Sequence, residues 1–280
     1  MEDQKLSTRI QVEQLFHKYE GTQSPAIDGI DLRIKSGEFA AIIGQNGSGK
    51  TTLVKHFNGL LLPTRGRVLV DGVDTRKRSI AELSRLVGYL FQNPDHQIFC
   101  PTVEKEVAFG PENLGLSKEE ARSRVDDALE LLGLGPYRSA PPTMLGLGQR
   151  RKVTLASVVA MRPEIMVLDE PTCGIDHKGS TDLMEAVKGL NERGHTIIMI
   201  THDMRIVSEY AHRTIVLCRG QVLLDDTTRS VFSKPEVLAE TFLAPPQITI
   251  LGQALEDYGI RRDILTVAEF YEQVVQRMRG

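Results

Sequence analysis

Residues 44–51 read Gly44-Gln45-Asn46-Gly47-Ser48-Gly49-Lys50-Thr51, directly after the apolar run Phe39-Ala40-Ala41-Ile42-Ile43, which has strand character. This spacing of glycines before Lys-Thr is a P-loop, in which consecutive backbone N–H groups turn toward a phosphate chain. Lys50 can then reach the β- and γ-phosphates, and the hydroxyl of Thr51 suits Mg²⁺. Residues 52–58 are predicted to form a helix closed by Gly59, with its amino end pointing at the anion.

The composition fits a nucleotide enzyme of one large α/β domain or two smaller ones. The chain has 280 residues and a formal net charge of −3. Without a basic footprint, no nucleic-acid partner is expected. The three cysteines lack C-x-x-C spacing, which suggests neither a zinc site nor a disulfide framework and fits a reducing cytosol. No apolar stretch approaches the roughly 18 residues that span a bilayer, and the charged segment 1–5 lacks the core of a signal peptide.

Short strands are predicted on both sides of the P-loop. Residues 10–16, 27–34, 67–70 and 87–91 have strand patterns, and together they suggest a small antiparallel sheet beside the nucleotide. A helix is predicted from Ser117 to Leu132, with a capping box at its start and a glycine after its end.

A second buried strand is predicted at residues 165–168, and it continues directly into Asp169 and Glu170. Two acids at the carboxyl end of an apolar strand form a Walker B arrangement, and this end of a parallel sheet is where α/β proteins place ligands. Asp169 is expected to hold Mg²⁺ through water. Glu170 is expected to polarise the water that attacks the γ-phosphate.

A third apolar run, residues 196–201, ends in His202. An imidazole at a strand terminus can lie beside the γ-phosphate and link it to the general base. The other histidines, including His17 and His56, lack this context and are expected to be structural.

These motifs, in this order, resemble the ATP-binding subunits of ABC transporters over residues 8–230. The resemblance implies that Gln92 binds Mg²⁺ and relays to the membrane partner, that Tyr19 stacks on adenine, and that Asp176 belongs to the D-loop. It implies an α/β fold: a P-loop NTPase core of the ABC ATPase type with an antiparallel β flank. The expected ABC ATPase domain is 8–240 with a helical subdomain inserted at about 94–161, followed by a C-terminal helical extension at 241–280.

The resemblance also implies the ligands and the site. ATP and Mg²⁺ are expected, with Lys50, Glu170 and His202 as catalytic residues and Thr51, Gln92 and Asp169 at the metal. The remaining ATP-binding positions are Tyr19, Gly44, Gln45, Asn46, Gly47, Ser48, Gly49 and Thr52.

A narrower resemblance comes from residues 91–99 and 102–113, which are similar to energy-coupling-factor ATPases, importers of vitamins or transition-metal ions. Those subunits work in pairs beneath a transmembrane coupling protein that carries a substrate-capturing membrane subunit. The expected location is therefore peripheral, on the cytoplasmic face of the cell membrane. Residues 251–279 resemble the C-terminal helices of that branch.

The family signature, normally leucine-serine-glycine-glycine-glutamine, is altered here to Leu145-Gly146-Leu147-Gly148-Gln149. In the family this segment faces the γ-phosphate bound to the other subunit of a dimer. Gly146 offers no hydroxyl to the phosphate. At Leu147 the backbone is expected to come close to the phosphate and to adopt a positive φ, and a bulky leucine suits neither requirement. The element is expected to be in place, before a helix at 150–161, but chemically weakened. The sequence alone does not fix whether the dimer is homo- or heteromeric, but a homodimer would carry the defect in both composite sites. A heterodimer with a related subunit is therefore predicted to be preferred, with low activity for this subunit alone.

Three alternatives remain. The chain could serve another ABC importer. A DNA-repair or chromosome-structure ATPase would carry a long coiled coil between P-loop and signature, and residues 52–144 show no sustained heptads. A regulatory nucleotide switch without turnover is favoured only by the altered signature, whereas Glu170 and His202 argue against it.

Overall fold

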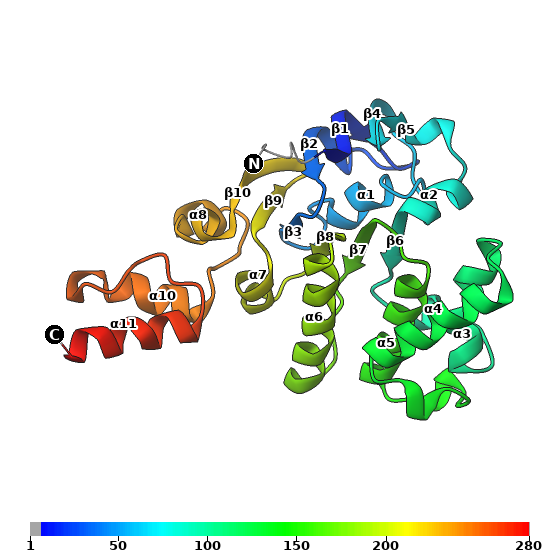
Figure 1. Cartoon of the computed structure of the whole chain (residues 1–280). Helices are drawn as coiled ribbons and strands as arrows, with labels where there is room; N and C mark the ends of the chain where they lie inside the picture. Colours follow the sequence, from blue (N-terminus) through cyan, green and yellow to red (C-terminus); the bar gives the residue numbers. More distant parts are fainter. Residues whose placement is uncertain (1–6, 280) are drawn as a thin grey trace, which may run out of the picture.

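The computed structural model describes residues 7–279, so the charged segment 1–5 lies outside the described residues. Two sheets form the centre of the molecule (Figure 1). A four-stranded antiparallel sheet has the order β2-β1-β4-β5, and a six-stranded sheet has the order β10-β9-β3-β8-β7-β6. The antiparallel strands are β1 (Thr8–His17), β2 (Ile27–Lys35), β4 (Arg65–Val70) and β5 (Val73–Asp74).

The six-stranded sheet is parallel except at β10, which pairs antiparallel with β9. Its strands are β3 (Phe39–Ile43), β6 (Val87–Leu90), β7 (Ile165–Asp169), β8 (Thr196–Ile200), β9 (Arg213–Cys218) and β10 (Gln221–Thr227). The assignment of residues 87–91 to the antiparallel sheet is wrong, because β6 pairs parallel with β7. A four-residue apolar run fits either sheet, and only its three-dimensional neighbour decides.

Alternate residues of β3 supply two different cores. Phe39 and Ala41 belong to the core under α5, α6 and α7, whereas Ala40 and Ile42 belong to the core shared with α1 and the antiparallel sheet. A strand covered on both faces needs apolar residues throughout, which is why the run before the P-loop is unbroken. The helices of this region are α1 (Lys50–Lys55), α2 (Ile80–Leu86), α6 (His177–Glu192), α7 (Met204–Tyr210) and α8 (Thr228–Phe232).

Three helices that pack on one another lie at one end of the molecule (Figure 1, green). They are α3 (Val103–Asn113), α4 (Lys118–Leu131) and α5 (Leu147–Ala160). Ser117 caps α4 by accepting a hydrogen bond from the N–H of Glu120 (3.1 Å). The reciprocal bond of the predicted capping box is not formed among residues 7–279. The helix predicted at 150–161 begins three residues earlier, so the signature itself forms its first turn.

The C-terminal helices lie at the opposite end of the molecule (Figure 1, orange to red). They are α9 (Pro235–Ala239), α10 (Gln247–Ala254) and α11 (Val267–Arg279). The Arg229 guanidinium on α8 donates to Glu269 on α11 (2.7 Å), which ties the extension to the core. The proposed limits of the domain, insert and extension stay a prediction. Among the described helices none is both long and apolar enough to cross a membrane.

Candidate active site

A pocket of about 320 Å³ lies at the carboxyl ends of β3 and β7, which is where a parallel sheet is expected to hold its ligand. It brings together residues from five separate stretches of the chain. The lining residues are Tyr19, Ala26, Asn46, Gly47, Gly49, Lys50, Thr51, Thr52, Gln92, Asp169, Glu170 and Ile200.

The P-loop needs its glycines for two separable reasons. Gly47 and Gly49 have φ values of 80° and 104°, in the left-handed region that other residues rarely adopt. A Cβ on Gly49 would also lie 2.6 Å from the carbonyl oxygen of Ala26. The Lys50 ammonium donates to the carbonyls of Gly44 (2.7 Å) and Gln45 (2.9 Å) across the loop. Helix α1 covers residues 50–55, so it begins two residues earlier and is one residue shorter than the helix predicted at 52–58.

Burial shapes the charges at the pocket. It lowers the pKa of Lys50, and the nearby carboxylates of Glu170 and Asp169 oppose that shift. Burial also raises the pKa of Asp169, although Tyr89 and Thr51 donate hydrogen bonds to its Oδ2 at 2.9 and 3.2 Å. A cation placed beside Asp169 would relieve this cost, because opposite charge favours the ionised carboxylate.

Glu170 is held in a strained backbone conformation. Its φ is 50°, which costs a residue with a side chain about 1–2 kcal/mol. Its N–H donates to the carbonyl of Ile200 (2.9 Å), so the neighbouring strand β8 fixes this turn. Strain of this kind persists where surrounding structure over-determines it, and here it aims the carboxylate at the pocket. The side chain of Glu170 is 11% exposed.

His202 lies beside Glu170, with its Nδ1 2.9 Å from Oε1. An ionised carboxylate only accepts hydrogen bonds, so Nδ1 carries the proton and donates. The imidazole is 68% exposed, which leaves its far edge accessible from solvent. His202 therefore meets the predicted general base, although it arrives from a different strand.

The residues of the pocket fit a nucleotide with Mg²⁺. Ser48 Oγ, inside the P-loop, is buried without a hydrogen-bond partner, and Thr51 and Asp169 place two oxygens together beside Lys50. Hydroxyl and carboxylate oxygens are what Mg²⁺ prefers, with phosphate oxygens and water completing its shell. Within the described residues no cluster of three or more His, Cys, Asp or Glu forms a protein-only metal site.

Tyr19 lies at the rim and is tied to the phosphate-binding helix. It is 41% exposed, and its hydroxyl is 3.1 Å from Thr52 Oγ1 on α1. Its ring meets that of His17 edge-on at 4.7 Å. His17 in turn contacts His56 (Nδ1 to Nε2, 3.1 Å), which is fully buried and bonds the carbonyl of Thr52 (2.8 Å). The two histidines are buried, and they link the predicted adenine platform at Tyr19 to the predicted phosphate site at α1.

The signature segment lies outside this pocket. Gly146 is the exposed N-cap of α5, and its N–H donates to Gln149 Oε1 (3.2 Å). Leu147 is the first helical residue, and no positive φ is found there, so the expected backbone strain is wrong. The Leu147 side chain packs on Gly174 in the chain's own D-loop, residues 173–176. The contact is so close that a Cβ added to Gly174 would lie 2.8 Å from Leu147 Cδ2. Leu145 is buried, and Asp176 caps α6 by accepting from the N–H of Gly179 (2.7 Å).

Sequence reasoning missed two polar residues near the site. Tyr89 on β6 donates to Asp169, and burial raises its pKa. Arg151 on α5 is buried and donates to the carbonyl of Cys173 in the D-loop (3.1 Å), and burial lowers its pKa. Tyr89 sits in an apolar strand pattern, and Arg151 sits in a basic helix start, so neither stands out in the sequence.

Together, the P-loop, the strand-end acids and the histidine pairing define a P-loop ATPase. The family model described as "ABC transporter" matches residues 27–173. The energy-coupling factor transporter ATP-binding protein EcfA1 of Caldanaerobacter subterraneus subsp. tengcongensis is 46% identical over 261 residues, covering 92% of this chain and 94% of the relative. EcfA2 of Clostridium tetani is 40% identical over 277 residues, covering 95% and 96%.

Solved structures agree with these relatives. The structure of cbiO1 from Clostridium perfringens, described as part of the ABC transporter complex cbiONQ, has a TM-score of 0.76 at 36% identity and covers 89% of this chain and 99% of that one. A further relative from C. subterraneus, named as an ABC transporter ATP-binding protein, is 50% identical over 230 residues, and this chain spans 40% of its length. The chain belongs to the ATP-binding proteins of ABC transporters, in their energy-coupling-factor branch.

Proposed function

We propose that the chain hydrolyses ATP to power an energy-coupling-factor importer of vitamins or transition-metal ions. Its active species would be a dimer, with ATP between the P-loop of one subunit and the signature of the other. The observation that carries the proposal is the convergence of Lys50, Thr51, Asp169 and Glu170 on one pocket, with His202 bonded to Glu170. Tyr19 and Gln92 line the same pocket, at the positions where the resemblance requires an adenine platform and a metal-sensing glutamine.

In this mechanism the chain's charges act on the transferred phosphoryl group. Lys50 lies in a partly desolvated position, where a cation stabilises developing phosphate charge more strongly than it would in water. Glu170 orients a water and accepts its proton as the new P–O bond forms and the bond to ADP breaks. Mg²⁺, held by Thr51 and Gln92 with Asp169 behind, would neutralise charge on the phosphates.

The bond between His202 and Glu170 decides which ring nitrogen is left for the phosphate. Its Nδ1 already donates to the carboxylate. To donate to the γ-phosphate as well, the ring would use its other nitrogen, Nε2, which lies on the edge away from Glu170.

An apolar groove of about 270 Å³ is the docking place that we propose for the membrane partner. It is lined by Phe91, the neighbour of Gln92, and by the exposed rings of Phe99 and Phe109, which meet edge-on at 4.7 Å. The buried carboxylate of Glu106 accepts from the N–H of Phe99 and so holds that loop in place (3.0 Å). An exposed aromatic cluster of this kind suits a helix of the coupling protein, and its contact with Phe91 would carry motion to the metal site.

Steady-state ATPase assays of the assembled complex test the proposal. Lys50→Ala should abolish turnover and weaken ATP binding, because the cationic clamp on the phosphates is lost. Lys188→Ala on α6, which lies outside the pocket, is the matched control and should turn over normally. Unchanged turnover in Lys50→Ala would refute the phosphate assignment.

Membrane recruitment tests the docking surface. With its coupling protein present, the chain should sediment with membranes, and Phe99→Ser should reduce that recruitment. Tyr258→Ser, at an equally exposed aromatic in the C-terminal extension, is the control. Recovery of the parent chain only in the unsedimented fraction would count against the transporter assignment.

A further inference from the structure

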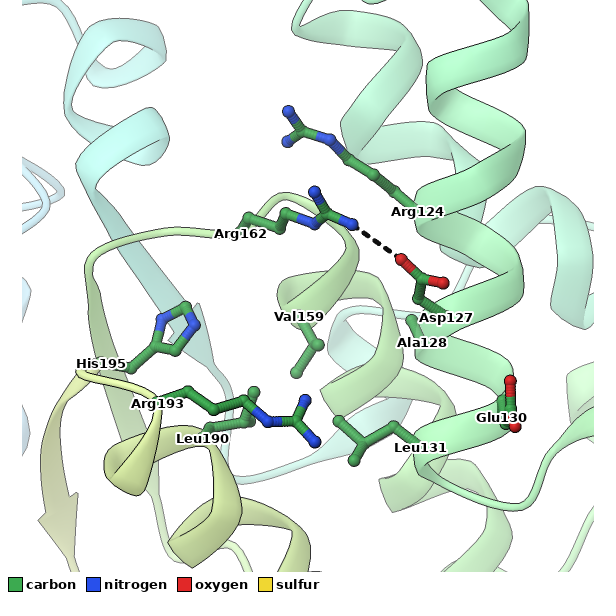
Figure 2. A pocket seen from close by; sticks show the side chains of 10 residues that line it. All are labelled: Arg124, Asp127, Ala128, Glu130, Leu131, Val159, Arg162, Leu190, Arg193 and His195. Carbon is green, nitrogen blue, oxygen red and sulfur yellow. Dashed lines mark hydrogen bonds and ion pairs between the residues drawn. The ribbon is translucent and has the colours of Figure 1, made fainter.

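A second hollow, of about 490 Å³, lies at the other end of the parallel sheet (Figure 2). Its walls come from α4, from the turn between α5 and β7, and from the turn between α6 and β8. His195 and Arg162 lie at the amino ends of β8 and β7, whereas Glu170 and Ile200 mark their carboxyl ends at the nucleotide pocket. The two pockets are therefore separate sites.

Arginine side chains outnumber carboxylates around this hollow. Three guanidinium groups, the imidazole of His195 and the carboxylates of Asp127 and Glu130 line it, and in Figure 2 the Glu130 carboxylate lies on the side of α4 away from the guanidinium groups. Asp127 is already committed to Arg162, at 2.7 Å. Within residues 7–279 the side chain of Arg193 forms neither a hydrogen bond nor an ion pair, which leaves its guanidinium available.

Arg124 adds a second unsatisfied donor. Its side chain is 16% exposed, and two of its nitrogens donate to the carbonyl of Met161 (3.2 Å) and to Glu120 (2.7 Å). The third, Nε, is buried without a partner. A buried donor without an acceptor costs about 1–3 kcal/mol, so an anion that reached it would recover that cost.

Arg162 reaches the rim through a strained backbone. It follows α5 with a φ of 53°, in the position where helices usually place glycine. Its N–H closes the helix end on the carbonyl of Val159 (2.8 Å). An arginine in this conformation is a backbone outlier, and its guanidinium lies at the hollow, where it pairs with Asp127 (Figure 2).

We propose that this hollow binds a small polyanion carrying phosphate or carboxylate groups. Guanidinium groups recognise such oxyanions by paired N–H bonds, and the volume falls within the range of small-ligand pockets. The apolar floor of Val159, Leu131 and Leu190 would accept a carbon skeleton between the charged groups. Because its walls belong both to α4 and α5 and to the sheet core, a bound anion would hold these parts together and stabilise the fold by mass action.

Calorimetric titration of inorganic pyrophosphate tests this site. The full chain is first saturated with ADP, so that the P-loop is occupied and cannot contribute. The parent should bind with a saturable heat, and Arg193→Gln should weaken the affinity at least tenfold. Arg122→Gln removes the same charge from the exposed outer side of α4 and should change the affinity less than twofold.

A second variant separates binding from folding. Arg162→Gly removes a guanidinium from the rim and also relieves the backbone strain, so its melting temperature without pyrophosphate should stay the same or rise. Its pyrophosphate affinity should nevertheless fall at least threefold. Absence of saturable binding in the parent, or equal weakening by Arg122→Gln, would overturn the proposal without touching the ATPase assignment.

Discussion

The P-loop pocket and the signature segment are the two halves of the proposed composite ATP site, and they differ in how completely their functional groups are present. In the pocket, every predicted catalytic group has a supporting contact: Lys50 on the loop carbonyls, Asp169 under Tyr89 and Thr51, Glu170 beside His202. At the signature, the exposed N-cap is Gly146, which has no side chain to offer. In a dimer each composite site takes one half from each subunit, so identical subunits would place the weak half in both sites.

The structure reduces the expected defects of the signature to one missing functional group. Helix α5 begins normally, and Leu147 is an unstrained helical residue that packs on the D-loop. The remaining deficit is one hydroxyl at position 146. Loss of one donor to transition-state charge typically costs about 3 kcal/mol, or on the order of 10²-fold in rate.

The largest expected effect on ATP hydrolysis comes from a change in the P-loop pocket, the half in which the functional groups are all present. Glu170→Gln should slow hydrolysis by roughly 10²-fold or more, because the general base is lost, while ATP binding is kept. An ATP-trapped dimer should accumulate and be seen by size-exclusion chromatography. Glu192→Gln, on the exposed end of α6, should leave the rate unchanged. Normal turnover in Glu170→Gln would remove the claim that this half is complete.

Repair of the weak half should have an effect of similar size and opposite sign. Gly146→Ser should raise the ATPase rate of the chain alone by on the order of 10²-fold. Leu147→Gly should add nothing to that gain and should lower the melting temperature, since it removes a contact with the D-loop and adds glycine to a helix. A gain from Leu147→Gly alone would show that its bulk, and not the missing hydroxyl, limits this half.

Acid should destabilise the fold through His56, which is buried beneath the P-loop helix α1. Burial lowers the pKa of His56 to about 4, below its ordinary 6.5, so between these values the unfolded chain binds more protons than the folded one. Stability is therefore lost as pH falls through this window, by about 3 kcal/mol once pH drops below 4. Chemical denaturation of the parent and of His56→Gln at pH 7 and pH 4.5 measures this. If the free energy of unfolding depended equally on pH in both proteins, His56 would not be the source of the acid sensitivity.

A smaller effect is expected from the support of Asp169. Tyr89→Phe removes one hydrogen bond to the carboxylate, and the loss of a bond to a charged acceptor costs at least about 1.5 kcal/mol. The Mg²⁺ concentration for half-maximal ATPase activity should rise about 10-fold with little change in the maximal rate. Tyr210→Phe, whose hydroxyl donates to Glu185 away from the pocket, is the control. A fall in maximal rate without a shift in Mg²⁺ dependence would refute this role for Tyr89.

Contiguous motifs were predictable because their functional groups come from residues that are adjacent in the sequence. The P-loop, the Asp169–Glu170 pair and His202 each end an apolar run, and parallel pairing brings those ends together. What the sequence could not predict depends on distances across the fold. The φ of Glu170 is fixed by β8, the place of β6 by its pairing with β7, and the packing of Leu147 by the D-loop.

The most direct test of unequal halves is a comparison of ATPase rates per competent site. The chain alone is compared with an equimolar pair formed with a related subunit whose signature carries the serine and glycine, the partner bearing a Glu-to-Gln change at its own general base. In the pair, only this chain's P-loop facing the intact signature can turn over. The rate per site in the pair should be on the order of 10²-fold above that of the chain alone. Equal rates would contradict it and would make the altered signature a tolerated variant.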